Sequence, residues 1–269
     1  MIKLITSDMD GTLLDENGNL PEEFGQILAE LKKRGVIFAP ASGRQYFSLR
    51  KIFDKYKEDL IFFAENGTMV IKNDKELFSR PMNREVALSA LDTAAKGNDN
   101  IFLVFCGKKD AYALNRQNRS EYVDELLKYY THSCFVENFA DVEDECIKVS
   151  FYDASGNSST VIYPLVEKFK ATEQVVLSSA YWVDITAAGV NKGSSIRQMQ
   201  KRLGITPDEC AAFGDFLNDK EMLQAVTYSF AMANAHPDIK KIARFETASN
   251  AEHGVIKGIQ KLIDDGLCG

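Results

Sequence analysis

The stretch TSDMDGTLLD places Asp8 and Asp10 directly behind the apolar run Ile2 to Ile5. Two carboxylates held close together repel each other, so a chain that keeps both at the end of a buried strand needs a cation beside them. Gly11 lets the backbone turn sharply at this point, which would bring Asp10 over the strand end. We interpret the stretch as a place where a metal ion and a phosphoryl group occupy the space between the two carboxylates.

Polar residues recur after other predicted strands and at the start of a predicted helix. In open parallel sheets, ligands bind beyond the carboxyl ends of the strands, so side chains from distant parts of the chain are expected to meet there. The residues that this reasoning brings together are Asp8, Asp10, Gly11, Thr12, Ser42, Lys192, Asp215, Asn218 and Asp219, with Arg44 nearby.

Mg²⁺ is the cation that suits such a set of residues. It takes one or two carboxylates, keeps several waters and contacts substrate phosphate. Without it, the four aspartates of the set would repel one another, whereas Mg²⁺ and Lys192 together offset most of their charge. The sequence therefore predicts Mg²⁺ as cofactor, held by Asp8, Asp10, Asp215 and Asp219.

Each motif also has an ordinary structural explanation. A DxD pair is commonly a solvated turn, Ser42 could cap a helix, and GDFLND could be an Asx turn before a helix. The four motifs nevertheless follow one another in order, each after an apolar strand or at a helix start. Independent accidents of this kind are improbable together, so their joint placement favours a site.

The elements that must position these residues form a discontinuous pattern. Strands and helices alternate in residues 1–81 and again in 187–269, which predicts an α/β, Rossmann-like domain with a parallel sheet and helices on both faces. Residues 82–186 read instead as adjacent strands joined by tight turns, with three helices. We expect them to form an inserted α+β cap domain, an antiparallel sheet with helices on one face.

Composition narrows the partners. The formal net charge of -7 disfavours nucleic acid, which demands a basic surface, but allows a small anionic substrate. Five scattered cysteines without a CxxC pair indicate reduced thiols. The apolar runs are too short to span a bilayer, and Asp8 interrupts any signal-peptide core. We expect a cytoplasmic monomer or weak homo-oligomer that acts on a small phosphorylated metabolite, without nucleic acid or membrane.

The motifs DMDGTLL, ASGR, VNKG and GDFLND, in that order, resemble the four motifs of the haloacid dehalogenase superfamily of phosphohydrolases. The insertion between ASGR and VNKG looks like the Cof-type branch, whose members carry a large α/β cap. FAENGTMV and FAMANAHPDIKKIA also resemble that branch. The likeness covers the whole predicted core, whereas the predicted cap agrees only in size and strand pattern.

The resemblance implies roles for the matching residues. Asp8 would be the nucleophile that forms an aspartyl-phosphate, and Asp10 would protonate the leaving alcohol and then activate water. Mg²⁺ would lie between the Asp8 carboxylate, the Asp10 backbone carbonyl and Asp215, with Asp219 either binding the ion or orienting a ligand. The residues expected to bind the phosphoryl group are Gly11, Thr12, Ser42, Lys192 and Asn218. Two asparagines in family-like loops suit either a substrate contact or loop ordering, namely Asn66 and Asn234.

The function that we favour is a Mg²⁺-dependent phosphatase of small phosphorylated metabolites, with sugar phosphates as the first class. A phosphomutase of the same superfamily shares the aspartyl-phosphate but needs a bisphosphate activator. A phospho-receiver module uses similar residues but is much shorter, and a non-catalytic binding protein is expected to have lost Asp8 or Asp10. Four aromatic residues of the insertion could stack on a sugar or base, although we favour a core role for them: Tyr112, Tyr152, Tyr181 and Trp182.

Overall fold

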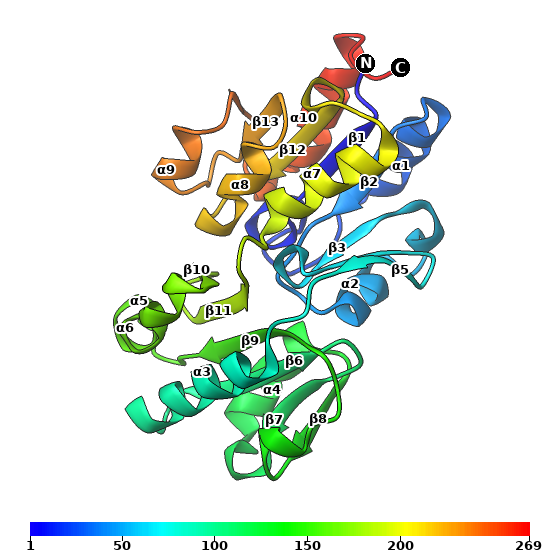
Figure 1. Ribbon diagram of the computed structural model, residues 1–269. Coiled ribbons are helices and arrows are strands. Elements are labelled where there is room, and N and C mark those ends of the chain that lie inside the picture. Colours follow the sequence, from blue (N-terminus) through cyan, green and yellow to red (C-terminus); the bar gives the residue numbers. More distant parts are fainter.

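The computed structural model describes residues 1–269. It has two layered bodies, one above the other in Figure 1, connected by two crossings of the chain. The upper body contains both termini, which lie close together at its far end. None of the helices combines the length and the apolar character that crossing a membrane requires.

A five-stranded parallel sheet forms the centre of the upper body. Its central strand and the strand beside it that leads to Asp8 are buried along their whole length, because the apolar side chains on both faces meet covering helices. In spatial order the strands are β14 (Phe245–Glu246), β13 (Tyr228–Ala231), β12 (Cys210–Gly214), β1 (Leu4–Ser7) and β2 (Ile37–Pro40).

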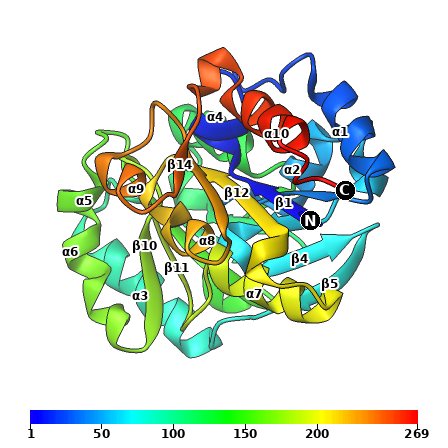
Figure 2. The same ribbon diagram turned by 90° about the horizontal axis from the view of Figure 1, so that it is seen from above.

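Helices cover both faces of this sheet, as predicted. The helices α1 and α10 lie on one face, and α7 and α8 lie on the other (Figure 2). The helices of the upper body are α1 (Phe24–Lys33), α2 (Tyr46–Ile52), α7 (Lys192–Leu203), α8 (Lys220–Leu223), α9 (Pro237–Lys240) and α10 (Gly254–Asp264).

A three-stranded antiparallel sheet continues the edge beyond β2. It consists of β3 (Phe62–Ala64), β4 (Met69–Lys72) and β5 (Lys75–Ser79). This small sheet meets the end of β2 through a single parallel bridge between Ala41, directly after β2, and Phe63, within β3. The hairpin of β4 and β5 was not predicted.

The lower body is built on a six-stranded sheet. In spatial order its strands are β10 (Glu173–Leu177), β11 (Trp182–Ala187), β9 (Cys146–Tyr152), β6 (Phe102–Gly107), β7 (Ala111–Leu114) and β8 (Ser133–Val136). The prediction of a purely antiparallel sheet is wrong at one pair, because β7 and β8 run parallel. The helices are α3 (Arg84–Gly97), α4 (Ser120–Tyr129), α5 (Ser158–Val161) and α6 (Tyr163–Val166).

The prediction of helices on only one face of this sheet is also wrong. Side chains alternate across β6, so Leu103 and Phe105 pack with α3, whereas Phe102 stacks on Tyr122 of α4 with ring centroids 4.9 Å apart. One of the three helices expected in the insertion, over SSTVIYPLVEKFK, is divided into short pieces around Pro164, which has no backbone N–H for a continuous helix.

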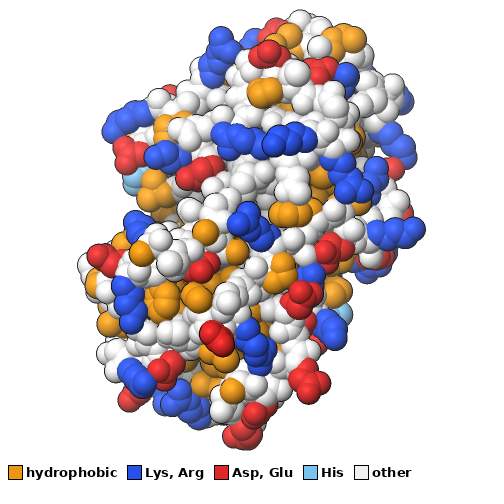
Figure 3. Space-filling model, viewed as in Figure 1, with side chains coloured by type: hydrophobic (Ala, Val, Ile, Leu, Met, Phe, Trp, Pro, Cys, Tyr) orange, Lys and Arg blue, Asp and Glu red, His pale blue; other side chains and the backbone are white.

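Charged side chains of both signs lie on the surface. On the face seen in Figure 3, acidic and basic side chains are interspersed over both bodies. All five cysteines are free thiols, and four of them are buried.

Candidate active site

The strand β1 delivers Asp8 to the centre of the sheet edge. The backbone N–H of Asp8 donates to the carbonyl of Phe213 in β12, 3.0 Å away, so the residue continues the ladder by one step. Its carboxylate is almost fully enclosed. Burial, followed by the charge of Asp219, raises the pKa of Asp8 well above its ordinary value.

Lys192 is the cation at this carboxylate. It begins α7, whose start is fixed by Asn191 and Ser194 capping each other's backbone. The ammonium lies 2.6 Å from Asp8 Oδ1 and 2.6 Å from Asp219 Oδ1, and its side chain is 0% exposed. Burial alone would lower the pKa of Lys192, but the two carboxylates outweigh it and raise the pKa, which keeps the group charged.

The loop after β12 supplies two more carboxylates. Asp219 is fully buried, and its Oδ2 accepts the backbone N–H groups of Asp215 and Phe216 at 3.0 and 3.2 Å. Asp215 accepts the Thr12 hydroxyl at 2.6 Å. Burial and the neighbouring Asp219 raise the pKa of Asp215 to about 7.

The acidic centre, by which we mean Asp8, Asp215 and Asp219, suits a hard cation. One oxygen from each of the three lies within 4.8 Å of the others. Three carboxylates face a single ammonium, which leaves a surplus of negative charge that a divalent ion would offset. Both oxygens of Asp219 are already taken by Lys192 and the two backbone N–H groups, so the free oxygens belong to Asp8 and Asp215.

Gly11 makes room for this centre. Its φ of +76° is in the left-handed region, and a Cβ at this position would lie 2.5 Å from Asp215 Oδ2. Any other residue would therefore be strained and would also push the carboxylate aside. The carbonyl of Gly11 accepts the amide of Asn234 at 2.8 Å, so that asparagine orders the turn.

Asp10 lies beside the centre, but its carboxylate does not join it. It forms a two-point ion pair with Arg44, with Nε to Oδ2 at 2.8 Å and Nη2 to Oδ1 at 2.5 Å, and it remains about half exposed. The same guanidinium donates to the carbonyl of Lys128 at 3.0 Å, which connects the site to the end of α4. The expected cluster of four carboxylates is thus a cluster of three, with Asp10 turned toward an arginine.

Of the residues predicted to bind phosphate, Ser42 and Asn218 line the pocket, whereas Thr12 does not. Ser42 faces the pocket, and its oxygen accepts the N–H of Arg44 at 3.1 Å, which leaves its hydroxyl hydrogen free to donate. Asn218 also faces the pocket and donates to Asn66 at 3.3 Å. Thr12 instead lies behind Asp215, with its hydroxyl spent on that carboxylate.

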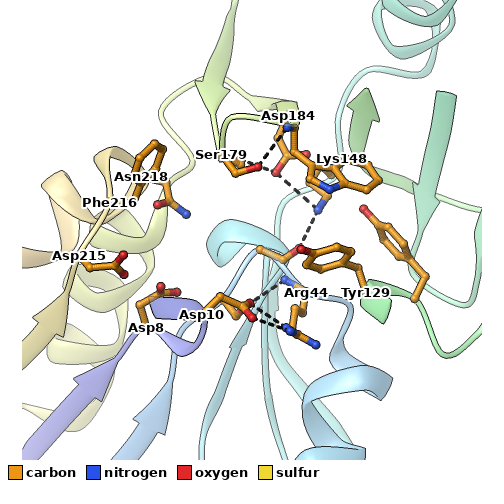
Figure 4. Close-up of a pocket in the computed structure, with 15 residues that line it drawn as sticks. Asp8, Asp10, Arg44, Tyr129, Lys148, Ser179, Asp184, Asp215, Phe216 and Asn218 are labelled. Carbon is orange, nitrogen blue, oxygen red and sulfur yellow. Dashed lines mark hydrogen bonds and ion pairs between the residues drawn. The ribbon is translucent and has the colours of Figure 1, made fainter. Parts of the chain in front are cut away.

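A pocket of about 220 Å³ lies over the acidic centre, between the parallel sheet and the six-stranded sheet (Figure 4). One wall consists of residues from the strand-end loops of the upper body, namely Asp8, Asp10, Ser42, Gly43, Arg44, Asp215, Phe216 and Asn218. The facing wall comes from the lower body and consists of Tyr129, Tyr130, Lys148, Ser178, Ser179, Trp182 and Asp184.

The sequence analysis did not predict most residues of the facing wall. Among the four aromatic residues considered there, Trp182 lines the pocket, with Tyr129 edge-on to it at 5.5 Å. A usable signal was present for Lys148 and Asp184, because each is a charged residue within an otherwise apolar strand, CIKVSFY or WVDIT. Charged side chains are almost never fully buried unless they are paired, so such positions indicate a partner.

The chemistry that this arrangement allows is nucleophilic. Asp8 presents a carboxylate oxygen that no protein group bonds, beside a buried ammonium and at the floor of a pocket. Asp10 and Ser42 stand at the rim with groups able to exchange or donate a proton. The set fits attack on a tetrahedral anionic centre whose charge Lys192 and a bound cation would offset.

The chain is similar to known hydrolases. Residues 5–259 match the family of haloacid dehalogenase-like hydrolases. The chain is 32% identical to the 5-amino-6-(5-phospho-D-ribitylamino)uracil phosphatase YbjI of Escherichia coli strain K12, over 97% of this chain and 96% of the relative. It is 29% identical to the HMP-PP phosphatase of Escherichia fergusonii, over 89% and 87%.

Solved structures agree as well. The structure of SMU.1108c from Streptococcus mutans UA159 superimposes with a TM-score of 0.91 at 29% identity, covering 98% of this chain and 100% of that one. The predictions of an α/β hydrolase fold and of an enzyme, a phosphatase, are thereby confirmed. The chain belongs to the haloacid dehalogenase-like hydrolases.

Proposed function

We propose that this enzyme is a Mg²⁺-dependent phosphatase that hydrolyses small phosphorylated metabolites through a phosphoryl group carried on Asp8. The observation that carries the proposal is the environment of that carboxylate. It is buried against Lys192 at 2.6 Å and keeps one oxygen free at the floor of the pocket. The names of the relatives, all phosphatases among those given above, support it.

In the first step, the free oxygen of Asp8 forms a bond to phosphorus while the bond from phosphorus to the ester oxygen breaks. Protonated Asp10 gives its proton to the departing alkoxide. This requires that one carboxyl oxygen of Asp10 is no longer bonded by Arg44. In the second step, Asp10 takes a proton from water, the water oxygen bonds to phosphorus, and the bond to Asp8 breaks. Inorganic phosphate leaves and both aspartates are regenerated.

Two residues hold charge during these steps. Lys192 stays on Asp8 and offsets the charge of the transferring group, and the free hydroxyl hydrogen of Ser42 can donate to a phosphoryl oxygen. Mg²⁺ would be held by Asp8, Asp215 and the Asp10 carbonyl, with Asp219 fixing the loop. When bound, it would supply further positive charge to the phosphoryl oxygens.

The pocket sets the class of substrate. Its volume of about 220 Å³ suits a small leaving group, and its facing wall combines an aromatic surface with hydroxyl groups. Sugar rings present hydroxyls and an apolar C–H face, and polyol chains present hydroxyls, which suits such a wall. The relative from Escherichia coli is named for a phosphorylated ribityl compound, a polyol of this kind.

The chain division completes the proposal. Residues 1–81 and 187–269 would act as the catalytic core, and residues 82–186 as a cap whose inner wall selects the leaving group. The two crossings, near Arg80 to Arg84 and Thr186 to Asn191, would allow the cap to open for substrate and close over it. We retain the prediction of a cytoplasmic enzyme.

The experiment is a screen for phosphate release from a generic aryl phosphate and a panel of sugar and polyol phosphates, with and without Mg²⁺. We expect release only with Mg²⁺, and a loss of about 10³-fold or more in Asp8→Asn, since the nucleophile is gone while the shape is kept. Activity that Asp8→Asn retains in full would overturn the proposal. Return of the phosphoryl group to a second position of the substrate would instead indicate a phosphomutase.

A further inference from the structure

A second fully buried ammonium lies in the facing wall of the pocket. Lys148 is in the middle of β9, with its side chain 2% exposed. Its Nζ donates to the carbonyl of Gly43 at 2.8 Å and lies 2.6 Å from Glu65 Oε2 and 3.7 Å from Asp184 Oδ2. Gly43 and Glu65 belong to loops at the strand ends of the upper body. A side chain of the lower body therefore contacts the upper body beside the pocket.

The two loops that it reaches are already tied to each other. The N–H of Glu65 donates to the carbonyl of Arg44 at 3.0 Å, and the N–H of Asn66 donates to the carbonyl of Ser42 at 2.9 Å. The turn from Ser42 to Arg44 and the loop after β3 therefore move together. The ammonium of Lys148 contacts both segments, because it donates to the carbonyl of Gly43 in the turn and pairs with the carboxylate of Glu65 in the loop.

The loop after β3 is strained in a way that serves this contact. Glu65, Asn66 and Gly67 have φ values of 52°, 57° and 90°, three consecutive residues in the left-handed region. Non-glycine residues rarely adopt it, and such strain persists where the surroundings require it. Here it places Glu65 on the ammonium, and the amide of Asn66 on Asp184 Oδ2 at 2.6 Å.

Asp184 completes the cluster from the lower body. Its carboxylate accepts hydrogen bonds from Ser150 at 2.5 Å, from Ser178 at 2.7 Å and from Asn66. Burial alone would lower the pKa of Lys148, but the attraction of Asp184 and then of Glu65 raises it well above its ordinary value. The lysine therefore stays charged and can hold both contacts in this structure.

We propose that Lys148 is a positioning residue for the reaction at Asp8. By holding the carbonyl of Gly43 it fixes the turn that carries Ser42 and Arg44, and so aligns the Ser42 hydroxyl and the ion pair of Arg44 with Asp10. Its effect passes through the turn and not through the leaving group. The inference rests on the proposed phosphatase function and adds a residue of the lower body to the alignment of the phosphoryl site.

The test compares Lys148→Met with the double variant Lys148→Met/Glu65→Gln. The single variant leaves buried carboxylates without their cation, so both its melting temperature and its activity should fall. Removing both charges of a buried pair is often close to neutral, so the double variant should regain most of the melting temperature. Its kcat should stay about 10²-fold below that of the unaltered enzyme, because nothing then holds the Gly43 carbonyl.

The substrate panel separates positioning from leaving-group recognition. The turn acts on the phosphoryl group, which all substrates share, so kcat should fall by the same factor for each ester in both variants. Recovery of kcat together with the melting temperature in the double variant would reduce Lys148 to a stability role and overturn the proposal. A loss confined to one leaving group would overturn it as well.

Lys108 supplies the matched control. It also connects the two bodies, through Glu76 of β5 at 3.2 Å, and it pairs with Glu145 of its own body at 2.9 Å, but both partners are exposed. Lys108→Met removes one lysine that bridges the two bodies without touching the turn. We expect a change in kcat of no more than about twofold, since exposed ion pairs contribute little.

Hydrogen exchange gives a readout that needs no activity. In both Lys148 variants the amides of Glu65 and Asn66, which bond the turn, should exchange about tenfold faster than in the unaltered protein or in Lys108→Met. Unchanged exchange at these amides would overturn the proposal. If the unaltered enzyme released phosphate from no ester, the proposed function would fail, and exchange would still decide whether Lys148 holds the turn.

Discussion

Lys192 and Lys148 are buried to the same degree, yet they stand in different electrostatic surroundings. Lys192 meets Asp8 and Asp219 at 2.6 Å each, with Asp215 close by. Three carboxylates therefore share one ammonium, and the surplus negative charge faces the pocket. Burial first, and then the negative charge of Asp219, raises the pKa values of Asp8 and Asp215.

The cluster around Lys148 has a smaller surplus, with two carboxylates to one ammonium, and only Asp184 of the two lines the pocket. One of its two carboxylates, Asp184, already accepts three hydrogen bonds from protein groups. The other, Glu65, lies enclosed against the ammonium and does not line the pocket. Glu65 Oε1 has no hydrogen-bond partner, but it is buried outside the pocket lining, so the cluster offers no free oxygen to a substrate or an ion in the pocket.

The comparison separates two uses of a buried lysine. A buried ammonium with too many carboxylates around it, one of them facing a cavity, marks a place for a cation and an anionic substrate. A buried ammonium that is enclosed by its partners marks a contact that fixes the relative positions of the segments it connects. Burial alone does not distinguish them, whereas the charge balance and the free oxygens do.

The largest change in the free energy of unfolding that would test this comparison is expected in Lys192→Met. Removing one partner of a buried ion pair costs about 3–5 kcal/mol of unfolding free energy, and Lys148→Met should cost a similar amount. Mg²⁺ should restore part of the stability of Lys192→Met, because the acidic centre keeps free oxygens, but none of that of Lys148→Met. Urea unfolding with and without Mg²⁺ measures both, and equal rescue of the two variants would contradict the distinction.

A smaller effect is expected from Mg²⁺ on the unaltered protein. A ligand present at about 100 times its Kd stabilises the folded state by about 2.7 kcal/mol. Asp215→Asn should lose most of that gain, since it removes one of the two carboxylates with a free oxygen. Thermal melting in Mg²⁺ and in a chelator is the measurement, with the exposed Asp92→Asn as control. A full Mg²⁺ shift in Asp215→Asn would place the ion elsewhere.

The smallest effect concerns pH in the metal-free protein. Folding raises the pKa of Asp215 from 3.8 to about 7, so between these values the folded chain binds more protons than the unfolded chain. The contribution of this group to stability is therefore greatest below pH 3.8 and declines as the pH rises to about 7. Asp215→Asn should flatten the decline in a chelator, and an unchanged slope would show that the group does not titrate in this way.

The fold and the acidic centre were largely predictable from the sequence for one physical reason. The carboxyl ends of parallel strands lie at one edge of the sheet. Once the stretches of β1 and β12 were recognised as buried strands of one parallel sheet, Asp8 and Asp215 were expected at the same edge, and the two strands are in fact neighbours. Lys192 followed from its position at the start of a predicted helix. These features depend on local periodicity and caps, which a single sequence carries.

The facing wall was not predictable in the same way. Lys148 and Asp184 were each a lone charge in an apolar strand, and their partners depend on how one sheet lies over another. The left-handed backbone of Glu65 is imposed by that packing, since glutamate has no local preference for it. The parallel pairing of β7 with β8 likewise reflects tertiary contacts that no local pattern reports.

The account depends most directly on a covalent bond between Asp8 and phosphorus. Borohydride reduces an acyl phosphate to an alcohol, so enzyme quenched during turnover with Mg²⁺ and treated with borohydride should carry homoserine at position 8, detected by peptide mass spectrometry. The same treatment of Asp8→Asn should yield none. Homoserine at another aspartate, or rapid phosphate release with an unmodified Asp8, would contradict the assignment of the nucleophile.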